Sequence, residues 1–265
     1  MRIGVIGCCG RMGRTVIREI VQAPDLELAG GIDRPDHPEL GRDLGELAGL
    51  PPLGLRAGAD LETLLDGAGA VVEFSTAEAS IAHARRCAAR GVPLVLGTTG
   101  FTAEQDAELS ELARVFPLLV APNMSLGVNL LLALTERVAR ALGPEFDIEI
   151  FEMHHRHKVD APSGTALALG RAAAAGRGVR LEEVAVRARE GITGPRVSGT
   201  IGFASLRGGD VVGDHAVIFA GEGERIVLQH LASDRKIYAR GALAAARWLV
   251  GRPPGRYGMR DVLGL

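Results

Sequence analysis

Short apolar runs alternate with amphipathic stretches through the first half of the chain. Residues 2–7 and 26–32 predict buried strands, and residues 12–21 between them carry apolar side chains on one helical face. Further strands are expected at residues 70–74, 93–96 and 117–120, and helices at residues 77–90 and 103–115. Because strands alternate with helices, the pattern predicts an α/β fold with a Rossmann-type parallel sheet.

The pattern changes in the second half of the chain. A helix at 128–141, a strand at 147–153, a helix at 165–175 and strand-like runs between residues 184 and 231 predict an α+β domain with a mixed or antiparallel sheet. The last helix, residues 239–249, is apolar enough to pack back on the first domain. We therefore expect one domain from residues 1–125 and 236–265 and a second from residues 126–235. The Gly-rich and Pro-rich segment 189–209 is expected to be a mobile loop.

Composition narrows the class of protein. With 265 residues, 47% of them hydrophobic, the chain can bury a sizeable core, and a net charge of −2 gives no reason to expect nucleic acid or membrane binding. The apolar run at residues 3–9 is too short for a membrane span and lacks the features of a signal peptide, so we expect a cytoplasmic protein. Cys8, Cys9 and Cys87 lack the usual zinc spacing and are interpreted as reduced core residues.

A turn with three glycines follows the first predicted strand. Gly7, Gly10 and Gly13 precede a predicted helix, where backbone amides and the helix N-terminus can approach a pyrophosphate. The spacing is GxxGxxG, with Cys9 where the commoner dinucleotide motif has its second glycine. The alternative is that these glycines serve only tight packing.

An acidic residue ends the second predicted strand. Asp33 lies about 20 residues beyond Gly13, where an acid would accept hydrogen bonds from an adenosine ribose, and Arg34 after it can accommodate a 2′-phosphate. The pair therefore allows NADH or NADPH, the alternative being a solvated turn before Pro35. The segments 97–100 and 121–124 also follow predicted strands, so they are either nicotinamide-lining turns or ordinary strand-to-helix turns.

The densest chemical signal lies between residues 152 and 165. His154, His155, Arg156, His157 and Lys158 stand in a row, and Lys158 is one of only two lysines among 30 basic residues. In extended backbone, His155 and His157 would face away from the other three. A predicted helix start at 162–165 adds amides that can bind a carboxylate.

This cluster therefore favours a small dicarboxylate substrate. One alternative is a solvated basic turn that pairs with acids such as Glu152 and Asp160. A metal site is disfavoured, because Arg156 and Lys158 would repel the ion and the histidines lack the helical i, i+4 spacing. No metal ligand is therefore assigned.

Several motifs resemble the 4-hydroxy-tetrahydrodipicolinate reductase (dihydrodipicolinate reductase) family in order from end to end. They are GCCGRMG at 7–13, EFST at 73–76, GTTGF at 97–101, APNMSLGVN at 121–129, HHRHKVDAPSGTA at 154–166, IGFASLRGGDVVGDH at 201–215 and ARGAL at 239–243. The HHRHKVDAPSGTA segment is highly specific. The resemblance covers nearly the whole chain.

The resemblance implies reduction of hydroxy-tetrahydrodipicolinate to tetrahydrodipicolinate with NADPH or NADH and loss of water, in lysine and diaminopimelate synthesis. It implies a dinucleotide-binding first domain and a second domain that binds substrate and forms a homotetramer. His154 takes the family's acid/base position and Lys158 its proton-donor position. His155, Gly164 and Thr165 fall on substrate positions. The cofactor positions are Gly7, Cys8, Cys9, Gly10, Arg11, Met12, Asp33, Arg34, Gly97, Thr98, Thr99, Ala121, Pro122, Asn123 and Met124.

The chain departs from the family pattern at three of these positions. Cys8 and Cys9 replace smaller residues, and Asp33 stands where a longer glutamate is common. Two other functions compete with the family activity: another Rossmann reductase of amino-acid precursors, and a nucleotide-sensing protein without turnover. The first would not need the basic cluster with its helix start, and the second would need only the cofactor half.

Overall fold

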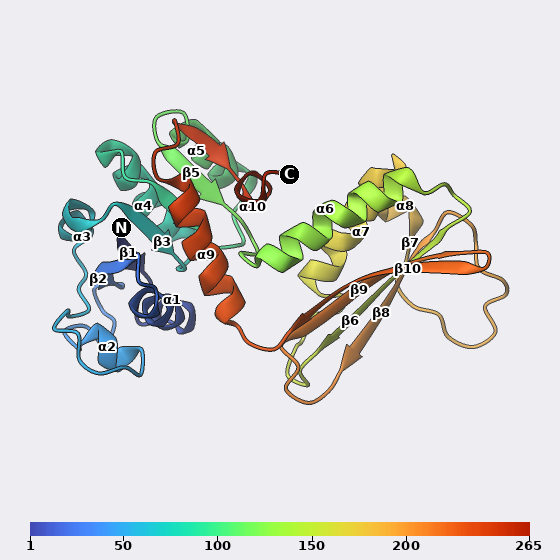
Figure 1. The fold of residues 1–265 in the computed structure, drawn as a ribbon, viewed down its shortest axis with the longest axis horizontal. Helices are drawn as coiled ribbons and strands as arrows, with labels where there is room; N and C mark the ends of the chain where they lie inside the picture. Colours follow the sequence, from blue (N-terminus) through green and yellow to red (C-terminus); the bar gives the residue numbers. More distant parts are fainter. The chain divides into compact units, whose positions relative to one another are not determined.

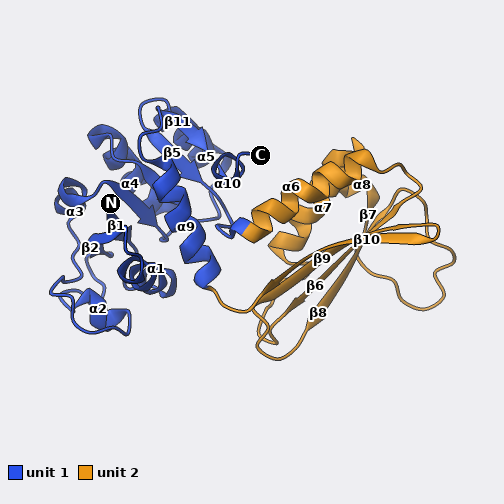
Figure 2. Ribbon diagram, in the orientation of Figure 1, with its two compact units in different colours: residues 1–126, 236–265 blue, residues 127–235 orange.

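The chain forms two compact units. A computed structural model describes residues 1–265 and divides them into unit 1, Met1–Leu126 with Lys236–Leu265, and unit 2, Gly127–Arg235 (Figures 1 and 2). The chain leaves unit 1 once and returns to it once. No helix has the combined length and hydrophobicity that a bilayer crossing demands.

Unit 1 is built on a six-stranded sheet in which every pairing is parallel, in the order β11-β5-β4-β3-β1-β2. The strands are β1 (Arg2–Ile6), β2 (Glu27–Ile32), β3 (Ala70–Glu73), β4 (Leu94–Leu96), β5 (Pro117–Val120) and β11 (Gly255–Tyr257). The helices are α1 (Arg11–Gln22), α2 (Leu44–Leu47), α3 (Leu61–Gly67), α4 (Ala77–Arg90), α5 (Ala103–Leu112), α9 (Lys236–Leu249) and α10 (Met259–Leu263). The strand order reverses beside β1, since β2 pairs with one of its edges and β3 with the other. Ligands of open α/β sheets bind outside the carboxyl ends of the strands at such a point.

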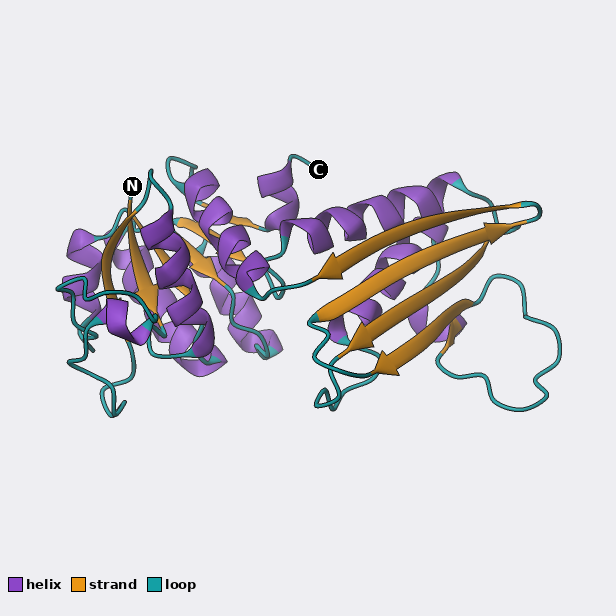
Figure 3. Ribbon diagram, turned by 60° about the horizontal axis from the view of Figure 1, so that its bottom comes forward, coloured by secondary structure: helices purple, strands orange, loops and turns teal.

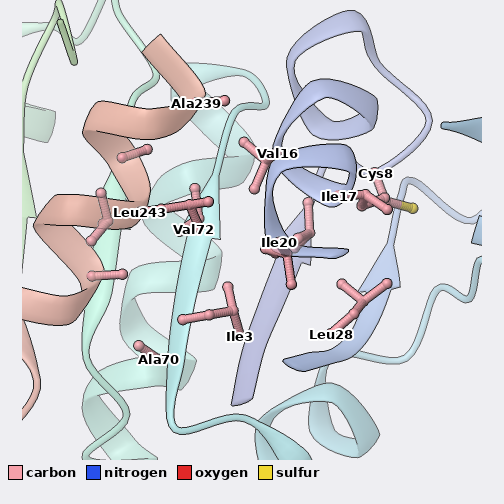
Figure 4. Packing of buried hydrophobic residues seen from close by; sticks show 14 of the residues in the cluster. Ile3, Cys8, Val16, Ile17, Ile20, Leu28, Ala70, Val72, Ala239 and Leu243 are labelled. Atoms are coloured by element: carbon pink, nitrogen blue, oxygen red, sulfur yellow. The ribbon is translucent and has the colours of Figure 1, made fainter. Parts of the chain in front are cut away.

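Helices α1 and α9 supply much of one hydrophobic core of unit 1. Val16 and Ile20 of α1 and Leu243 of α9 are buried in the same cluster as Ile3 of β1 and Val72 of β3 (Figure 4). A second buried cluster includes residues of α3, α4 and α5. Because both faces of the parallel sheet are buried, its strands consist of continuous apolar runs. Residues of α9 thus pack in the same buried cluster as residues of β1 and β3.

Unit 2 is a five-stranded mixed sheet in the order β10-β9-β6-β8-β7. Its strands are β6 (Asp147–His154), β7 (Ala185–Val186), β8 (Ile201–Arg207), β9 (Gly213–Gly221) and β10 (Glu224–Ala232), and its helices are α6 (Leu126–Ala141), α7 (Gly164–Arg177) and α8 (Leu181–Val184). The helices lie against one face of the sheet (Figure 3). Alternate residues of β6, among them Ile148 and Ile150, are buried, as a half-covered strand requires.

The predicted fold class is confirmed, and one predicted loop is partly wrong. Within the segment 189–209, residues 201–207 form β8, which pairs in parallel with β6 and buries Ile201 and Phe203 in the core of unit 2. The nearby glycines made this segment resemble a loop in the sequence, although it forms an ordinary strand. The short elements α2, α3, β11 and α10 were not predicted, because each is too brief to show a period.

A glycine in α9 permits its close approach to the rest of unit 1. A Cβ atom on Gly241 would overlap the carbonyl oxygen of Met124, which is backbone and cannot turn aside. Glycine inside a helix otherwise costs about 1 kcal/mol relative to alanine. The close contact between α9 and the β5–α6 turn therefore depends on the missing side chain.

We predict that Gly241→Ala destabilises the protein by about 2 kcal/mol or more, because overpacking outweighs the gain in helix propensity. Urea unfolding measures the change. Gly67→Ala, in α3, is the matched control, because a Cβ atom there meets nothing closer than the Arg2 guanidinium at 3.6 Å. Equal stability of the two variants would contradict the packing argument.

Candidate active site

The glycine turn after β1 is shaped by close backbone packing. Gly7 has φ +79°, and a Cβ atom on it would overlap the Phe74 carbonyl oxygen, while one on Gly13 would overlap the Gly7 carbonyl oxygen. Gly10 is the N-cap of α1 and supplies no side-chain cap, and the first turn of α1 holds no acid. Packing thus accounts for Gly7 and Gly13, whereas the uncapped amides that follow Gly10 in the first turn of α1 suit an anion.

Asp33 connects the glycine turn to the end of β2. Its Oδ2 accepts a hydrogen bond from the Cys9 amide at 2.9 Å, and its Oδ1 accepts one from the Arg34 amide at 3.0 Å. The Arg34 side chain, 66% exposed, pairs with Asp36 at 3.0 Å. Asp33 is therefore fixed by the backbone beside the glycine turn, and Arg34 is held by a neighbouring acid.

The other predicted cofactor positions lie at the same edge of the sheet. Thr98, after β4, is buried and accepts a hydrogen bond from the Ser75 amide at 3.0 Å. Ala121 and Met124, after β5, are buried, and Asn123 Oδ1 accepts from the Ser125 amide at 2.9 Å. Gly97 and Met12 are half-buried, while Arg11, Thr99 and Pro122 are exposed. The fold thus gathers the predicted positions at the carboxyl ends of neighbouring strands.

Reasoning from the sequence assigned no role to a buried carboxylate at this edge. Glu73, at the end of β3, is fully buried, and its Oε1 meets Ser75 Oγ at 2.5 Å, Ser80 Oγ at 2.9 Å and His83 Nδ1 at 2.8 Å. These bonds fix the turn that contacts Thr98. The EFST motif was its only signal, since Ser80 and His83 lie on the next helix.

The three cysteines are buried and free, as predicted. Burial raises the pKa of the Cys8 and Cys9 thiols, and the carboxylate of Asp33 acts in the same direction. Burial also raises the pKa of Cys87 to about 12. All three are protonated thiols at neutral pH.

In unit 2, the carboxylate of Glu152 organises the polar residues. Glu152 is 1% exposed and accepts two hydrogen bonds from Arg207, each at 2.9 Å. Its Oε2 also meets His154 Nδ1 at 2.5 Å, and its Oε1 accepts from the Ser163 amide at 3.2 Å. Burial alone would raise the pKa of Glu152, but the hydrogen bonds from Arg207 and His154 outweigh it and lower the pKa. Glu152 is therefore ionised inside the unit.

His154 is oriented by this carboxylate. Because Nδ1 is bonded to Glu152, Nε2 is the ring nitrogen left for other chemistry, and a Cβ atom on Gly213 would lie 3.0 Å from it. The ring packs edge-on against His215 with 5.0 Å between centroids. A carboxylate on one nitrogen of an imidazole fixes which ring nitrogen is left to face a ligand.

The basic segment is a turn beyond His154, so the predicted extended alternation of residues 154–158 is wrong. The Lys158 amide donates to the His155 carbonyl at 3.1 Å and closes the turn, leaving Arg156 and His157 exposed. Lys158 Nζ donates to Asp160 Oδ1 at 2.8 Å. That bond lowers the pKa of Asp160. The alternative in which the basic residues pair with acids is thus present in part. Lys158 pairs with Asp160 and His154 with Glu152, but Glu152 is buried and not solvated.

The helix start next to this turn is braced from inside the unit. Ser163 caps α7 by accepting from the Ala166 amide at 3.2 Å, and its hydroxyl lies 3.2 Å from His215 Nε2. Gly164, the first residue of α7, is exposed, and a Cβ atom on it would meet nothing within 4 Å. Thr165 is half-buried. The first amides of α7 thus lie in a region with room for a ligand.

Two histidines near the turn are kept neutral. Burial lowers the pKa of His215 to about 4, with the nearby His154 acting in the same direction. Burial also lowers the pKa of His155, and the positive charge of Arg235 lowers it further. His155 Nδ1 is buried without a hydrogen-bond partner.

Reasoning from the sequence gave Arg207 and His215 no role, and it gave Ser163 only a place in the predicted helix start. Arg207 ends β8 and His215 lies in β9, 55 and 63 residues beyond Glu152 in the chain. The sheet register places His215 beside Glu152. Only the IGFASLRGGDVVGDH motif, which contains Arg207 and His215, offered a signal.

Comparisons with known proteins agree over the whole chain. Sequence profiles described as dihydrodipicolinate reductase, N-terminus and C-terminus, match residues 1–124 and 127–263. The 4-hydroxy-tetrahydrodipicolinate reductase of Parvibaculum lavamentivorans is 56% identical over 266 residues, covering 100% of this chain and 98% of that protein. The protein of the same name from Rhodopseudomonas palustris (strain BisB18) is 56% identical over 265 residues, with 100% and 98% covered.

A solved structure extends the likeness to the fold. Dipicolinate-bound dihydrodipicolinate reductase from Paenisporosarcina sp. TG-14 superposes with a TM-score of 0.80 at 26% identity and covers 98% of each chain. The resemblance predicted from seven motifs is confirmed. Both units match, so the chain belongs to the dihydrodipicolinate reductase family.

Proposed function

We propose that this chain reduces 4-hydroxy-tetrahydrodipicolinate to tetrahydrodipicolinate with NADPH or NADH, releasing water, as a step of lysine and diaminopimelate synthesis. The observation that carries the proposal is the pairing of a carboxylate-held His154 and Lys158 with the open start of α7. The match of both halves to one family supports this activity over another Rossmann reductase. A nucleotide sensor would have no use for the proton-transfer groups of unit 2.

The residues of unit 1 fit a dinucleotide. The uncapped N-terminus of α1 suits a pyrophosphate, and Asp33, held by the Cys9 and Arg34 amides, retains lone pairs for ribose hydroxyls. The remaining predicted positions, 97–99 and 121–124, would line the nicotinamide. The bound nicotinamide supplies the hydride. A carboxylate at Asp33 favours NADH, and Arg34 admits the 2′-phosphate of NADPH.

The residues of unit 2 fit a dicarboxylate. The Gly164 amide and Thr165 would bind one carboxylate at the start of α7, where the helix dipole favours negative charge. His155 and the cations of the same turn would bind the other. Neutral His155 donates one hydrogen bond without adding charge, so Lys158 and neighbouring arginines provide the electrostatic attraction.

A proton must reach the substrate as the hydride arrives, because hydride addition builds negative charge on the conjugated carbon–nitrogen system. Two groups can deliver it, Lys158 and His154. Glu152 would orient the ring of His154 through Nδ1, while Asp160 positions the ammonium of Lys158. An arginine at residue 158 would retain its proton.

The assembly and location follow from the family resemblance and are part of the proposal. We propose a cytoplasmic homotetramer that binds neither nucleic acid nor membrane. Its contacts would form through the sheet of unit 2, where β10 exposes Ile226, Val227 and Leu231 by 36%, 52% and 59%. The tetramer stays a prediction.

The activity is tested by the fall in nicotinamide absorbance when the purified protein meets freshly generated hydroxy-tetrahydrodipicolinate, with NADPH and NADH in parallel. We expect rapid oxidation of at least one cofactor. If both cofactors bind, an authentic reductase consumes the same substrate and this protein does not, the proposed activity is wrong.

We predict that Lys158→Ala and Lys158→Arg lower kcat on the order of 100-fold, the usual contribution of a proton donor, and change dinucleotide affinity far less. Steady-state kinetics and a direct dinucleotide titration separate the two effects. Arg171→Ala, at an exposed position of α7, is the control for removing a cation. Comparable losses of kcat and dinucleotide affinity would mean that Lys158 is structural.

The depressed pKa of His215 predicts a pH-dependent stability. The folded pKa, about 4, lies below the ordinary 6.5, so the unfolded chain binds more protons between these values and stability falls as pH drops through this range. From pH 7 to pH 5 the wild type should lose about 2 kcal/mol more than His215→Asn. Urea unfolding at both pH values gives the difference. Parallel losses in the two proteins would show that His215 titrates normally.

A further inference from the structure

Metal-ligating side chains surround the glycine turn of unit 1. The Sγ atoms of Cys8 and Cys9 and a carboxylate oxygen of Asp33 all lie within 4.8 Å of one another. A second group, Cys9 with His37 and Glu39, meets the same limit. Cys9 belongs to both groups, and the mechanism proposed above uses neither thiol.

The separation of the two sulfur atoms suits one shared ion. Cys8 Sγ and Cys9 Sγ lie 3.8 Å apart. Zinc–thiolate bonds are about 2.3 Å long, so two thiolates on a tetrahedral zinc ion lie about 3.8 Å apart. A disulfide requires about 2.05 Å. The distance between the two Sγ atoms is therefore the distance that a soft tetrahedral cation requires between two thiolate ligands.

The remaining donors differ in their availability. Asp33 already accepts from two backbone amides, but each carboxylate oxygen has a second lone pair, and the residue is half-buried, whereas both thiols are buried. Glu39 is paired with Arg14 and Arg42, and His37 Nδ1 accepts from the Glu39 amide. Cys8, Cys9 and Asp33 therefore form the better ligand set.

We propose that Cys8, Cys9 and Asp33 bind a thiophilic divalent cation of the zinc and cadmium class, and that the bound ion and the dinucleotide exclude each other. The two thiol protons leave to solvent as the metal–sulfur bonds form. An ion bonded to Asp33 removes the oxygen lone pairs that a ribose would use. This exclusion rests on the proposed cofactor site, whereas ion binding does not.

The proposal assigns ligands where the sequence alone predicts none. Adjacent cysteines lack the usual zinc spacing, and Asp33 follows Cys9 by 24 residues. The end of β2 brings the third donor to the turn, because Gly7 and Cys8 both donate to the Ile32 carbonyl, at 2.9 and 3.1 Å. The ligand set is thus a product of the β1–β2 pairing.

Titration of the reduced protein with Cd²⁺, followed by the ultraviolet charge-transfer absorption of cadmium–thiolate bonds, tests the site without any dinucleotide. We expect one equivalent to bind, Cys8→Ala and Cys9→Ala to abolish the signal, and Asp33→Asn, which removes a ligand charge, to weaken binding. Cys87→Ala, which removes the third buried thiol, is the matched control and should bind as the wild type does. Circular dichroism checks that each variant is folded.

An unchanged signal in folded Cys9→Ala, or its loss in Cys87→Ala, would overturn the site. Repeating the titration with a saturating concentration of whichever dinucleotide binds should raise the apparent Kd for Cd²⁺ at least tenfold, and saturating Cd²⁺ should by mutual linkage raise the apparent Kd for that dinucleotide. Unchanged Cd²⁺ affinity would overturn the exclusion. If neither dinucleotide binds at all, the proposed function fails while the cadmium result stands.

Discussion

The buried carboxylate of Glu152 is the interaction on which the candidate chemistry of unit 2 depends. It joins the end of β6 to the end of β8 through Arg207 and to the start of α7 through the Ser163 amide, and it orients His154. Removing one partner of such a buried pair typically costs 3–5 kcal/mol, because the remaining charge stays buried without compensation. The same bonds that stabilise the unit therefore set the geometry of its reactive groups.

Much of unit 1 was predictable because its information is local. Buried parallel strands appear as continuous apolar runs, and the glycine turn, Asp33 and the later turns each follow a strand directly, so their meeting at one sheet edge follows from topology. The short helix α2 was not predictable. Its N-cap, Asp43, also accepts hydrogen bonds from the Leu53 and Gly54 amides, so a contact outside the helix stabilises it.

The candidate site of unit 2 was predictable only in part. The density of cations at residues 154–158 pointed to an anion, yet the turn closed by Lys158 had no periodic signature. Arg207 and His215 reach the site through strand register, which depends on the whole mixed sheet. Local spacing therefore identified the candidate residues of the proposed site, while the residues that orient them required the structure.

Because unit 1 is discontinuous in the sequence, its two segments are synthesised at different times. The ribosome synthesises the first segment of unit 1 before unit 2, but α9 and β11 come from residues 236–265, which follow unit 2 in the chain. Helix α9 buries Ala239, Ala242 and Leu243 in the core with Ile3, and β11 pairs with β5. Unit 2 is one continuous segment and can complete its core while translation continues. The nascent dinucleotide-binding unit must therefore wait, with apolar strands exposed, until residues 236–265 have been synthesised, and chaperones can act on it during that interval.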